Sequence, residues 1–394
     1  MKNLIKNCNQ IVLIILIILI NQTIFCQSQP AKPEKVYRIV YVQKPDEWYQ
    51  QQARLWEQEI KKNSKNPEAW YNYYNAVRYA RYTETIDTKD KKAKLNQIIE
   101  DMGKAIPGTY EYHLLKYWNH YSMTDIEDLK KAYEINPDKP DTYYGFISYY
   151  EEHGNNEKLK AFLSKLYESR DVAPGLINYN YNVLATTEKD AILFTNGDND
   201  TYPVWILQQV KDIRPDVTVL NTSLIMTGKP YLERKLKEKN ITIDYDALPE
   251  YRSENFVSGL CKYIAEKYPA IPIYFALTVY SPVTESISDD LYMTGLAHKY
   301  SPTRIDNLAM MKNNWENNLR LDYLTDDWYS EGYVATETIM KTLNQNYIPS
   351  ALSLYEHYKI SGESEKAERV KQLALQIAKP AGKEQEVMEI LMKK

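Results

Sequence analysis

Closely spaced cysteine and histidine residues are missing from this chain. The 394 residues contain three cysteines, Cys8, Cys26 and Cys261, and none of them belongs to a Cys-x-x-Cys pair. The five histidines show neither His-x-His nor His-Glu-x-x-His spacing. Zinc centres are usually built from such closely spaced ligands. The sequence therefore argues against a zinc enzyme.

An excess of positive charge is also missing. The chain has 49 Lys and Arg against 53 Asp and Glu, which gives a formal net charge of −4. Nucleic-acid binding proteins need clustered basic side chains to neutralise phosphates, so we expect no nucleic-acid partner. A glycine-rich loop ending in Lys-Ser or Lys-Thr is absent, which excludes nucleotide hydrolysis of that type.

Long hydrophobic runs are missing beyond the N-terminus. The run "IVLIILIILI" covers residues 11–20 and follows Lys2 and Lys6. A basic start, an apolar core of about 7–15 residues and a polar exit are typical of a secretory signal peptide. We therefore expect residues 1–26 to be removed, the protein to be exported to the periplasm, and no membrane span to remain. If Cys26 is lipidated or the signal stays uncleaved, the protein is membrane-attached instead.

Phenylalanine is rare, whereas tyrosine is abundant: the chain has 6 Phe and 36 Tyr. Many of the tyrosines lie in residues 48–175, where apolar positions recur at helical spacing. Helix starts after Pro67, Pro107 and Pro137 indicate repeated helical pairs. Residues 334–394 repeat the pattern, because Gly362 aligns with Gly154 at an inter-helix turn.

These helical segments resemble tetratricopeptide (TPR) repeats. The matching residues are Asn136-Pro137 before a helix, Tyr143, Tyr144 and Gly145 within it, and Gly154 after it. TPR arrays bind peptides or proteins in a concave groove, so the resemblance implies a partner groove. A tyrosine row at helical spacing is also what a repeat core requires, and both interpretations stay open. The candidate groove residues are Trp70, Tyr74, Tyr143 and Tyr144.

Between the helical segments, residues 176–333 are predicted to form an α/β domain. Apolar runs of strand length alternate there with helical patterns, which indicates a parallel sheet of three or more strands, similar to half of a Rossmann fold. A leader at 27–47, with one short strand at 36–42, precedes the helices. The expected strands of the α/β domain lie at 190–196, 217–225 and 271–279, and the expected helices at 202–212, 228–240 and 254–268.

The stretch "TNGDND" (195–200) follows the first of these strands. Ligands of open parallel sheets bind at the carboxyl ends of the strands, and carboxylates suit Mg²⁺ or Ca²⁺. No cofactor is firmly implied. We expect Gly197 to allow close backbone approach, Thr201 to cap the next helix, and Asp198 and Asp200 to be the metal ligands if a cation binds. The candidate ligand-binding residues are Asn196, Gly197, Asp198, Asn199, Asp200, Thr201, Asn221 and Ser281, with Thr278 at the same edge.

Three interpretations of the acidic loop remain open. The first interpretation is a structural turn. Asp and Asn side chains are favoured in turns because they bond nearby backbone N–H groups. The residue types also allow a ligand or cation site, or a catalytic centre. The catalytic residues, if any, are not identified.

The central segment also resembles a known family. "AILFTNGDNDTYPVWILQQVKDIRPDVTVLNTSLI" (191–225), "IPIYFALTV" and "TGLAHKYSP" are similar to the soluble part of a bacterial membrane-protein family of unknown function. The membrane-spanning half of that family is similar to protein O-mannosyltransferases. The resemblance covers about 179–305, and this chain departs from it at Gly228–Tyr231. It implies an exported α/β module linked to envelope glycan or glycoprotein handling.

Two functions follow from these observations. The first is a protein-interaction or scaffold module of the cell envelope, in which helical repeats hold a protein or peptide partner. The alternative is a cation- or sugar-phosphate-binding module, or an enzyme, centred on the loop at 197–201. The first is the prediction, and it is supported by the aromatic residues of the repeats, which are Trp70, Tyr71, Tyr73, Tyr74, Tyr143 and Tyr144.

Overall fold

The computed structural model describes residues 32–80, 88–122, 124–326 and 328–393, so the predicted signal peptide and Cys26 lie outside the described residues. The described chain divides into two compact units. Unit 1 contains the residues up to Val36 together with Pro45–Ile106, and unit 2 contains Tyr37–Lys44 and Pro107–Lys394. The chain thus contributes eight residues to unit 2 before it completes unit 1.

Unit 1 is helical. Asn66 begins its second helix as predicted, because the Asn66 side chain accepts hydrogen bonds from the backbone N–H groups of Glu68 and Ala69, a common N-cap arrangement. Trp56 and Ile60 of the first helix are buried in the core of this unit. The helices are α2 (Asp46–Lys62), α3 (Pro67–Tyr79) and α4 (Thr88–Ala105).

Unit 2 begins with helical pairs. Within each pair the helices pack against each other, α5 on α6 and α7 on α8. Gly154 ends α7 with a left-handed φ of 68°, and the N–H of Asn155 then bonds the carbonyl of Tyr150 at 3.0 Å. This is the glycine turn that commonly ends helices. The helices are α5 (Tyr110–His120), α6 (Glu127–Ile135), α7 (Asp141–Glu152), α8 (Asn156–Glu168) and α9 (Pro174–Thr186).

A five-stranded mixed sheet lies at the centre of unit 2. Its strand order is β2-β1-β3-β5-β4, with β2, β1 and β3 parallel and β5 antiparallel to β3 and β4. Three parallel strands are present where they were predicted, and the α/β plus all-α fold class is correct. The second strand ends at Asn221, however, and the rest of its predicted range, Thr222–Ile225, is helical. The strands are β1 (Ile192–Thr195), β2 (Thr218–Asn221), β3 (Ile273–Ala276), β4 (Leu291–Met293) and β5 (Ala297–Tyr300).

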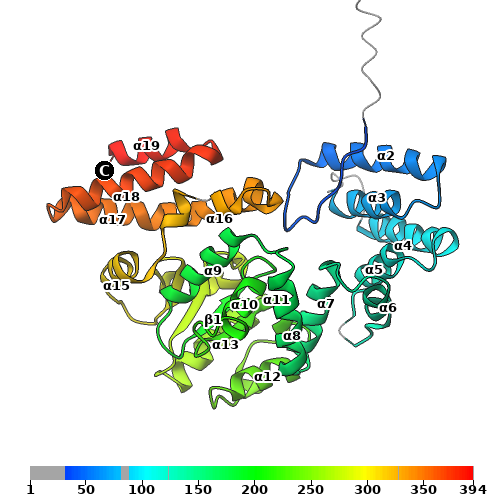
Figure 1. Ribbon diagram of the computed structural model, residues 1–394. Coiled ribbons are helices and arrows are strands. Elements are labelled where there is room, and N and C mark those ends of the chain that lie inside the picture. Colours follow the sequence, from blue (N-terminus) through cyan, green and yellow to red (C-terminus); the bar gives the residue numbers. More distant parts are fainter. Residues whose placement is uncertain (1–31, 81–87, 123, 327, 394) are drawn as a thin grey trace, which may run out of the picture. The chain divides into compact units, whose positions relative to one another are not determined.

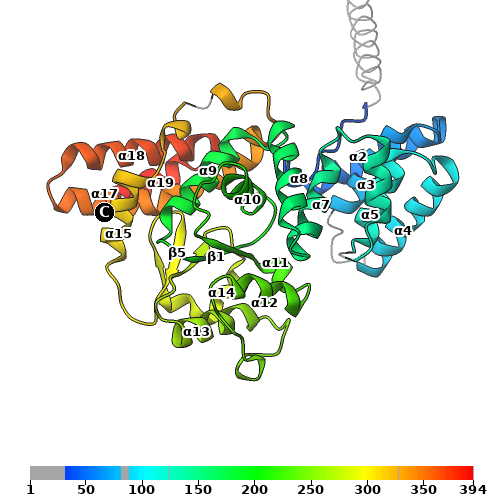
Figure 2. The same cartoon turned by 60° about the horizontal axis from the view of Figure 1, so that its bottom comes forward.

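Helices cover both faces of the sheet. Figure 2 shows α9 and α10 on one side of β1 and β5, and α12 and α13 on the other. The side chains of the three parallel strands are buried as a result, and Phe194 stacks on Phe275 of the neighbouring strand with ring centroids 4.6 Å apart. The connecting elements are α10 (Tyr202–Gln209), α11 (Thr222–Ile225), α12 (Lys229–Lys237), η1 (Tyr245–Ala247), α13 (Phe256–Lys267), α14 (Ser281–Thr284) and η2 (Glu285–Asp290).

The C-terminal helices of unit 2 lie side by side (Figure 1). Gly362, at φ 77°, ends α17 in the way that Gly154 ends α7, since the N–H of Glu363 bonds the carbonyl of Tyr358 at 2.8 Å. The predicted equivalence of these two turns is confirmed. The elements are α15 (Asn307–Asn313), η3 (Asn314–Asn318), η4 (Asp322–Leu324), η5 (Trp328–Ser330), η6 (Thr336–Met340), α16 (Lys341–Asn344), η7 (Gln345–Tyr347), α17 (Ile348–Ile360), α18 (Ser364–Ala378), η8 (Lys379–Ala381) and α19 (Glu384–Lys393).

The strand predicted at 36–42 is wrong. This segment has no regular secondary structure up to Arg38 and then turns, with the backbone N–H of Tyr41 bonded to the carbonyl of Arg38 at 2.9 Å. Its alternating side chains suggested a strand, but they make separate contacts with other elements instead of a ladder. The boundary between the two units, after Ile106, falls inside the range 48–175 that we expected to be one helical domain.

The aromatic residues suggested as a partner groove are core residues. Trp70 and Tyr74 are 6% and 1% exposed in unit 1, and Tyr143 and Tyr144 are 4% and 8% exposed in unit 2. Side chains buried to this extent do not line an open groove, so the groove interpretation is corrected to the core interpretation. Within the described residues, no helix is both long and apolar enough to cross a membrane.

Candidate functional site

The acidic loop that follows β1 folds back on itself around Asp200. Asp200 is 2% exposed. One carboxylate oxygen accepts the backbone N–H of Gly197 at 2.8 Å, and the other accepts that of Asn196 at 2.7 Å. The hydroxyl of Thr278, after β3, donates to the same oxygen as Asn196. The carboxylate therefore ties the end of β1 to the end of β3.

Burial and hydrogen bonding act in opposite directions on Asp200. Removal from water raises the pKa of this carboxyl above its ordinary value, while the bonds from Thr278, Asn196 and Gly197 partly offset that rise. Each carboxylate oxygen already accepts protein donors, so these bonds hold the carboxylate within its own loop. Such an arrangement is what a structural turn requires.

Thr201 lies in the N-cap position of α10 but makes no capping bond with its side chain, which corrects our expectation. Its hydroxyl lies 2.8 Å from that of Thr195 and accepts the side-chain amide of Asn221 at 3.0 Å. Asn221 in turn accepts the N–H of Leu224 and so caps α11. The polar residues after β1 and β2 thus form one continuous hydrogen-bond network.

Asp198 and Asn199 face a segment from far away in the chain, residues 37–44, which we call the strap. The guanidinium of Arg38 lies 3.5 Å from a carboxylate oxygen of Asp198. The side-chain amide of Asn199 donates to the backbone carbonyl of Val40 at 2.9 Å. The carbonyl of Asn199 accepts the side-chain amide of Asn180 on α9 at 2.7 Å. Both residues therefore fix the loop to its surroundings.

Gly197 and Ser281 have open surroundings. Apart from the chain neighbours of Gly197, no atom of the described residues lies within 4 Å of the place where a Cβ on Gly197 would sit, and its φ is not left-handed. Ser281 is exposed at the start of α14, and its carbonyl accepts the hydroxyl of Thr284 at 3.2 Å. The structure brings Thr278, and not Ser281, to the acidic loop.

The two aspartates proposed as metal ligands are engaged with different partners. Asp198 meets a guanidinium, whereas Asp200 is turned into its own loop. Within the part of the chain that the structure describes, no three His, Cys, Asp or Glu side chains are grouped closely enough to hold a metal ion. Divalent cations in proteins are usually bound by several oxygen ligands together. The loop geometry favours a structural role.

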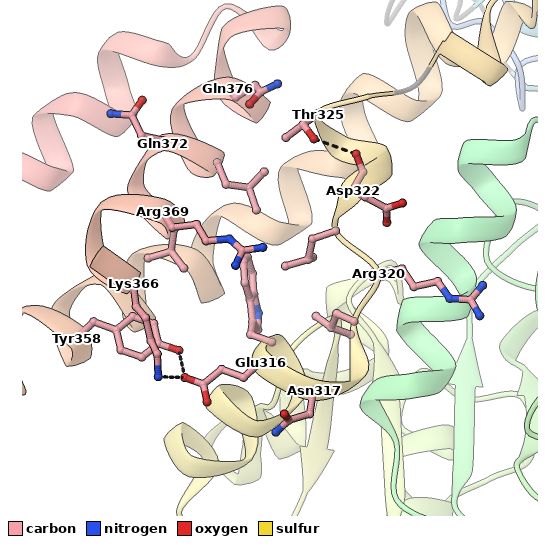
Figure 3. Close-up of a pocket in the computed structure, with 15 residues that line it drawn as sticks. Glu316, Asn317, Arg320, Asp322, Thr325, Tyr358, Lys366, Arg369, Gln372 and Gln376 are labelled. Carbon is pink, nitrogen blue, oxygen red and sulfur yellow. Dashed lines mark hydrogen bonds and ion pairs between the residues drawn. The ribbon is translucent and has the colours of Figure 1, made fainter. Parts of the chain in front are cut away.

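A large open cavity of unit 2 lies elsewhere, between α18 and the segment at 315–325. Its volume is about 970 Å³, and we call it the α18 groove (Figure 3). Its apolar lining consists of Trp315, Leu319, Leu321, Val370 and Leu373. Its polar lining consists of Glu316, Asn317, Arg320, Asp322, Thr325, Tyr358, Lys366, Arg369, Gln372 and Gln376.

The polar side chains of α18 line the groove because of their spacing. Arg369, Gln372 and Gln376 are separated by three and four residues, which places them on one face of a helix, and all three are exposed. Buried Val370 and Leu373 alternate with them and anchor the helix. In Figure 3, Arg369 extends into the groove between Glu316 at one end and Gln376 at the other.

Charge inside the groove is partly compensated. Glu316 accepts Lys366 at 2.9 Å and the hydroxyl of Tyr358 at 2.9 Å. The bond from Lys366 is the main reason why the pKa of Glu316 is lowered.

Trp315 is a buried residue of the groove lining. Its indole N–H has no hydrogen-bond partner among the described residues, which is uncommon in native proteins. The groove thus combines an apolar floor with charged and amide groups along its walls.

Sequence reasoning missed the α18 groove. Its two walls come from segments about 50 residues apart, and neither wall carries a recognisable motif. The only signal is the exposed run Arg369, Gln372 and Gln376, which looks like the solvent face of any amphipathic helix. The irregular segment at 315–325 forms the other wall of the groove. The path of such a segment cannot be predicted from the periodicity of the sequence.

Comparison with curated proteins found no match to the chain. One family does match part of it. The matched segment includes the acidic loop and Asn221 but ends before Thr278, and it contains none of the residues of the α18 groove. At 95 of 394 residues, it is about a quarter of the sequence. Residues 176–270 are similar to the family described as TMEM260-associated domain 2.

Proposed function

We propose that this protein is a protein-interaction module that binds an extended polypeptide segment in the α18 groove. The observation that carries the proposal is the groove itself, a cavity of about 970 Å³ with an apolar floor and exposed polar walls. Ligand pockets are usually roughly 300–1,000 Å³ in volume and combine apolar lining with a few placed polar groups.

The length of the groove suits a peptide. From Lys366 to Gln376 helix α18 rises about 15 Å, at about 1.5 Å per residue. An extended chain covers that length with about four or five residues, at about 3.3 Å each. The amide side chains of Gln376 and Asn317 can both donate and accept hydrogen bonds, so they can pair with the main chain of a bound peptide regardless of its sequence.

We place this activity in the cell envelope. The basic and apolar start of the sequence supports export to the periplasm, or attachment to the membrane if the signal stays uncleaved or Cys26 is lipidated. The resemblance to a bacterial family whose membrane half is O-mannosyltransferase-like supports a link to glycan or glycoprotein handling. The helical pairs around the sheet support a TPR-like scaffold.

The test is a peptide-binding measurement. Peptides selected from a random displayed library on the immobilised protein are synthesised, and their affinity is measured by fluorescence anisotropy. Arg369→Glu reverses a charge inside the groove and should weaken binding about tenfold or more, which corresponds to about 1.4 kcal/mol.

The matched control is Lys371→Glu, which makes the same change of charge on α18 but outside the groove. It should leave the affinity within about twofold, because surface charges outside an interface contribute little. Equal losses in the two variants, or a library from which no peptide is enriched, would contradict the proposal.

A further inference from the structure

The strap lies at the position where open α/β sheets bind ligands. The order β2-β1-β3 means that the chain leaves β1 to one side and returns to its other side. Ligands of such sheets bind beyond the carboxyl ends of the strands at this change of direction. In this protein the acidic loop after β1 and Thr278 after β3 meet there, and the strap packs against that loop through Arg38 and Val40.

The strap places one guanidinium in an acidic and aromatic recess. The guanidinium carbon of Arg38 lies 4.2 Å from the ring centre of Tyr144 and 5.6 Å from that of Trp118. Its nitrogen lies 3.5 Å from Asp198, and its side chain is only 11% exposed. Arginine is recognised in proteins by stacking on aromatic faces together with a carboxylate partner. Tyr144, Trp118 and Asp198 provide both.

The next residues of the strap are held through their backbone and one hydroxyl. The carbonyl of Val40 accepts the side-chain amide of Asn199, and that of Tyr41 accepts the hydroxyl of Thr338. The hydroxyl of Tyr41 donates to Asp171, which also accepts the hydroxyl of Tyr144 at 2.6 Å. Backbone carbonyls held by side-chain donors are a sequence-independent way to bind an extended peptide.

The strap nearly fills this recess. The space left between Val40, Tyr41, Tyr144, Asp198 and Asn199 has a volume of about 10 Å³, which is at the lower limit for a single water molecule. The ion pair between Arg38 and Asp198 is long at 3.5 Å, since charge-assisted N–H···O bonds are usually about 2.7–2.9 Å. The guanidinium of another arginine can make the same 3.5 Å contact with Asp198 that Arg38 makes.

We propose that this recess is a binding site for an arginine side chain on an extended peptide, and that residues Arg38–Tyr41 occupy it as an intramolecular ligand. The partner is a basic peptide segment that displaces the strap. The inference is independent of the α18 groove, because the two sites share no residue.

The first experiment tests the recess by chemical complementation in the full chain. Arg38→Ala removes the guanidinium and should lower the melting temperature. Methylguanidinium at millimolar concentration should then recover part of that loss, whereas methylurea, a neutral molecule of similar shape, should recover none. Wild-type protein should respond to neither compound. If methylguanidinium and methylurea have the same effect on Arg38→Ala, the recess does not recognise a guanidinium and the proposal is wrong.

The second experiment tests displacement by a partner. A labelled peptide with the sequence of residues 37–44, "YRIVYVQK", is titrated against wild type and Arg38→Gln, which keeps a side chain of similar length if the alanine variant fails to fold. The Arg38→Gln chain should bind the peptide more tightly than wild type, because its own strap competes less well.

The control for the second experiment is the same peptide with citrulline in place of arginine. It should bind about tenfold more weakly, the loss expected when a buried cationic partner becomes neutral. Asp198→Asn combined with Arg38→Gln should remove this preference. If the arginine and citrulline peptides bind alike, or if neither chain binds the peptide, the strap is a fixed structural clip and the proposal fails.

Discussion

Asp200 shows how a single buried carboxylate can organise a loop. Its oxygens accept two backbone N–H groups of the loop and the hydroxyl of Thr278. Asparagine at this position would turn an N–H₂ group toward one of those donors. We expect Asp200→Asn to lower the free energy of unfolding by about 1–3 kcal/mol, the usual effect of leaving buried partners unsatisfied, as measured by urea denaturation.

The control for this substitution is Gly197→Ala in the same loop. The space beside Gly197 is open and its φ is not left-handed, so alanine should change the unfolding free energy by less than about 0.5 kcal/mol. A large loss in Gly197→Ala, or none in Asp200→Asn, would mean that the loop has a different conformation.

The contribution of Asp216 to the free energy of unfolding should depend on pH. Its bonds with Arg214 at 2.8 and 2.9 Å lower the pKa of this carboxyl to about 2. The pKa of Asp216 in the folded protein lies below the ordinary pKa of an aspartate. The stabilisation that this carboxylate contributes is therefore complete when the pH is above the ordinary pKa, and it is lost as the pH falls through about 2. The difference in unfolding free energy between wild type and Asp216→Asn should therefore be constant at neutral pH and shrink in acid, as acid titrations of both proteins would show. A difference that grows in acid would reverse this assignment.

At the scale of elements, the two glycine turns make a matched pair. Gly362 ends α17 at φ 77°, and a methyl group added to it would have open space within the described residues, whereas a methyl on Gly154 would lie 2.7 Å from the side chain of Arg234. Gly362→Ala should lower the unfolding free energy by about 1–2 kcal/mol, the cost of a left-handed alanine. Gly154→Ala should cost more, because Arg234 bonds the carbonyl of Glu151 and would have to move. Urea denaturation of both variants measures the difference, and equal losses would contradict the Arg234 contact.

Sequence periodicity predicted the regular elements that are long and apolar. The strands at 190–196 and 271–279 were found because each contains a continuous buried run, Ile192–Thr195 and Ile273–Ala276. The helix at 254–268 was found because its buried residues recur at helical spacing. Strands β4 and β5 were missed because they are three and four residues long and mostly half-buried, with His298 and Lys299 in β5. Such short strands are stabilised by pairing with a neighbour, which a local pattern does not contain.

The candidate site was predicted in part for a similar reason. A turn rich in Asp and Asn after a strand indicated that the residues at 196–201 and Asn221 would share one edge, and the hydrogen bond between Thr201 and Asn221 joins them. Nothing local indicated that Arg38, 160 residues before Asp198, would meet that edge. Long-range partners of this kind depend on the whole fold and not on the spacing of neighbouring residues.

At the scale of the whole molecule, Cys261 can report on global unfolding. It is fully buried on α13, and burial raises the pKa of its thiol well above the ordinary value. Only the thiolate reacts readily with thiol reagents. In a chain that starts at Gln27, where Cys261 is the only cysteine, labelling should be slow in buffer and should follow the unfolding curve in urea. Fast labelling in buffer would show that α13 opens locally.

The strap also sets an order of events during biosynthesis. The hydroxyl of Thr338 bonds the carbonyl of Tyr41, a residue that precedes it by 297 positions. Contacts between residues so far apart in sequence form late, because a long loop must close before they contribute. During translation or export the strap therefore emerges long before its binding partners exist. A chaperone that recognises extended aromatic segments would find its target here, in the interval before the C-terminal helices are complete.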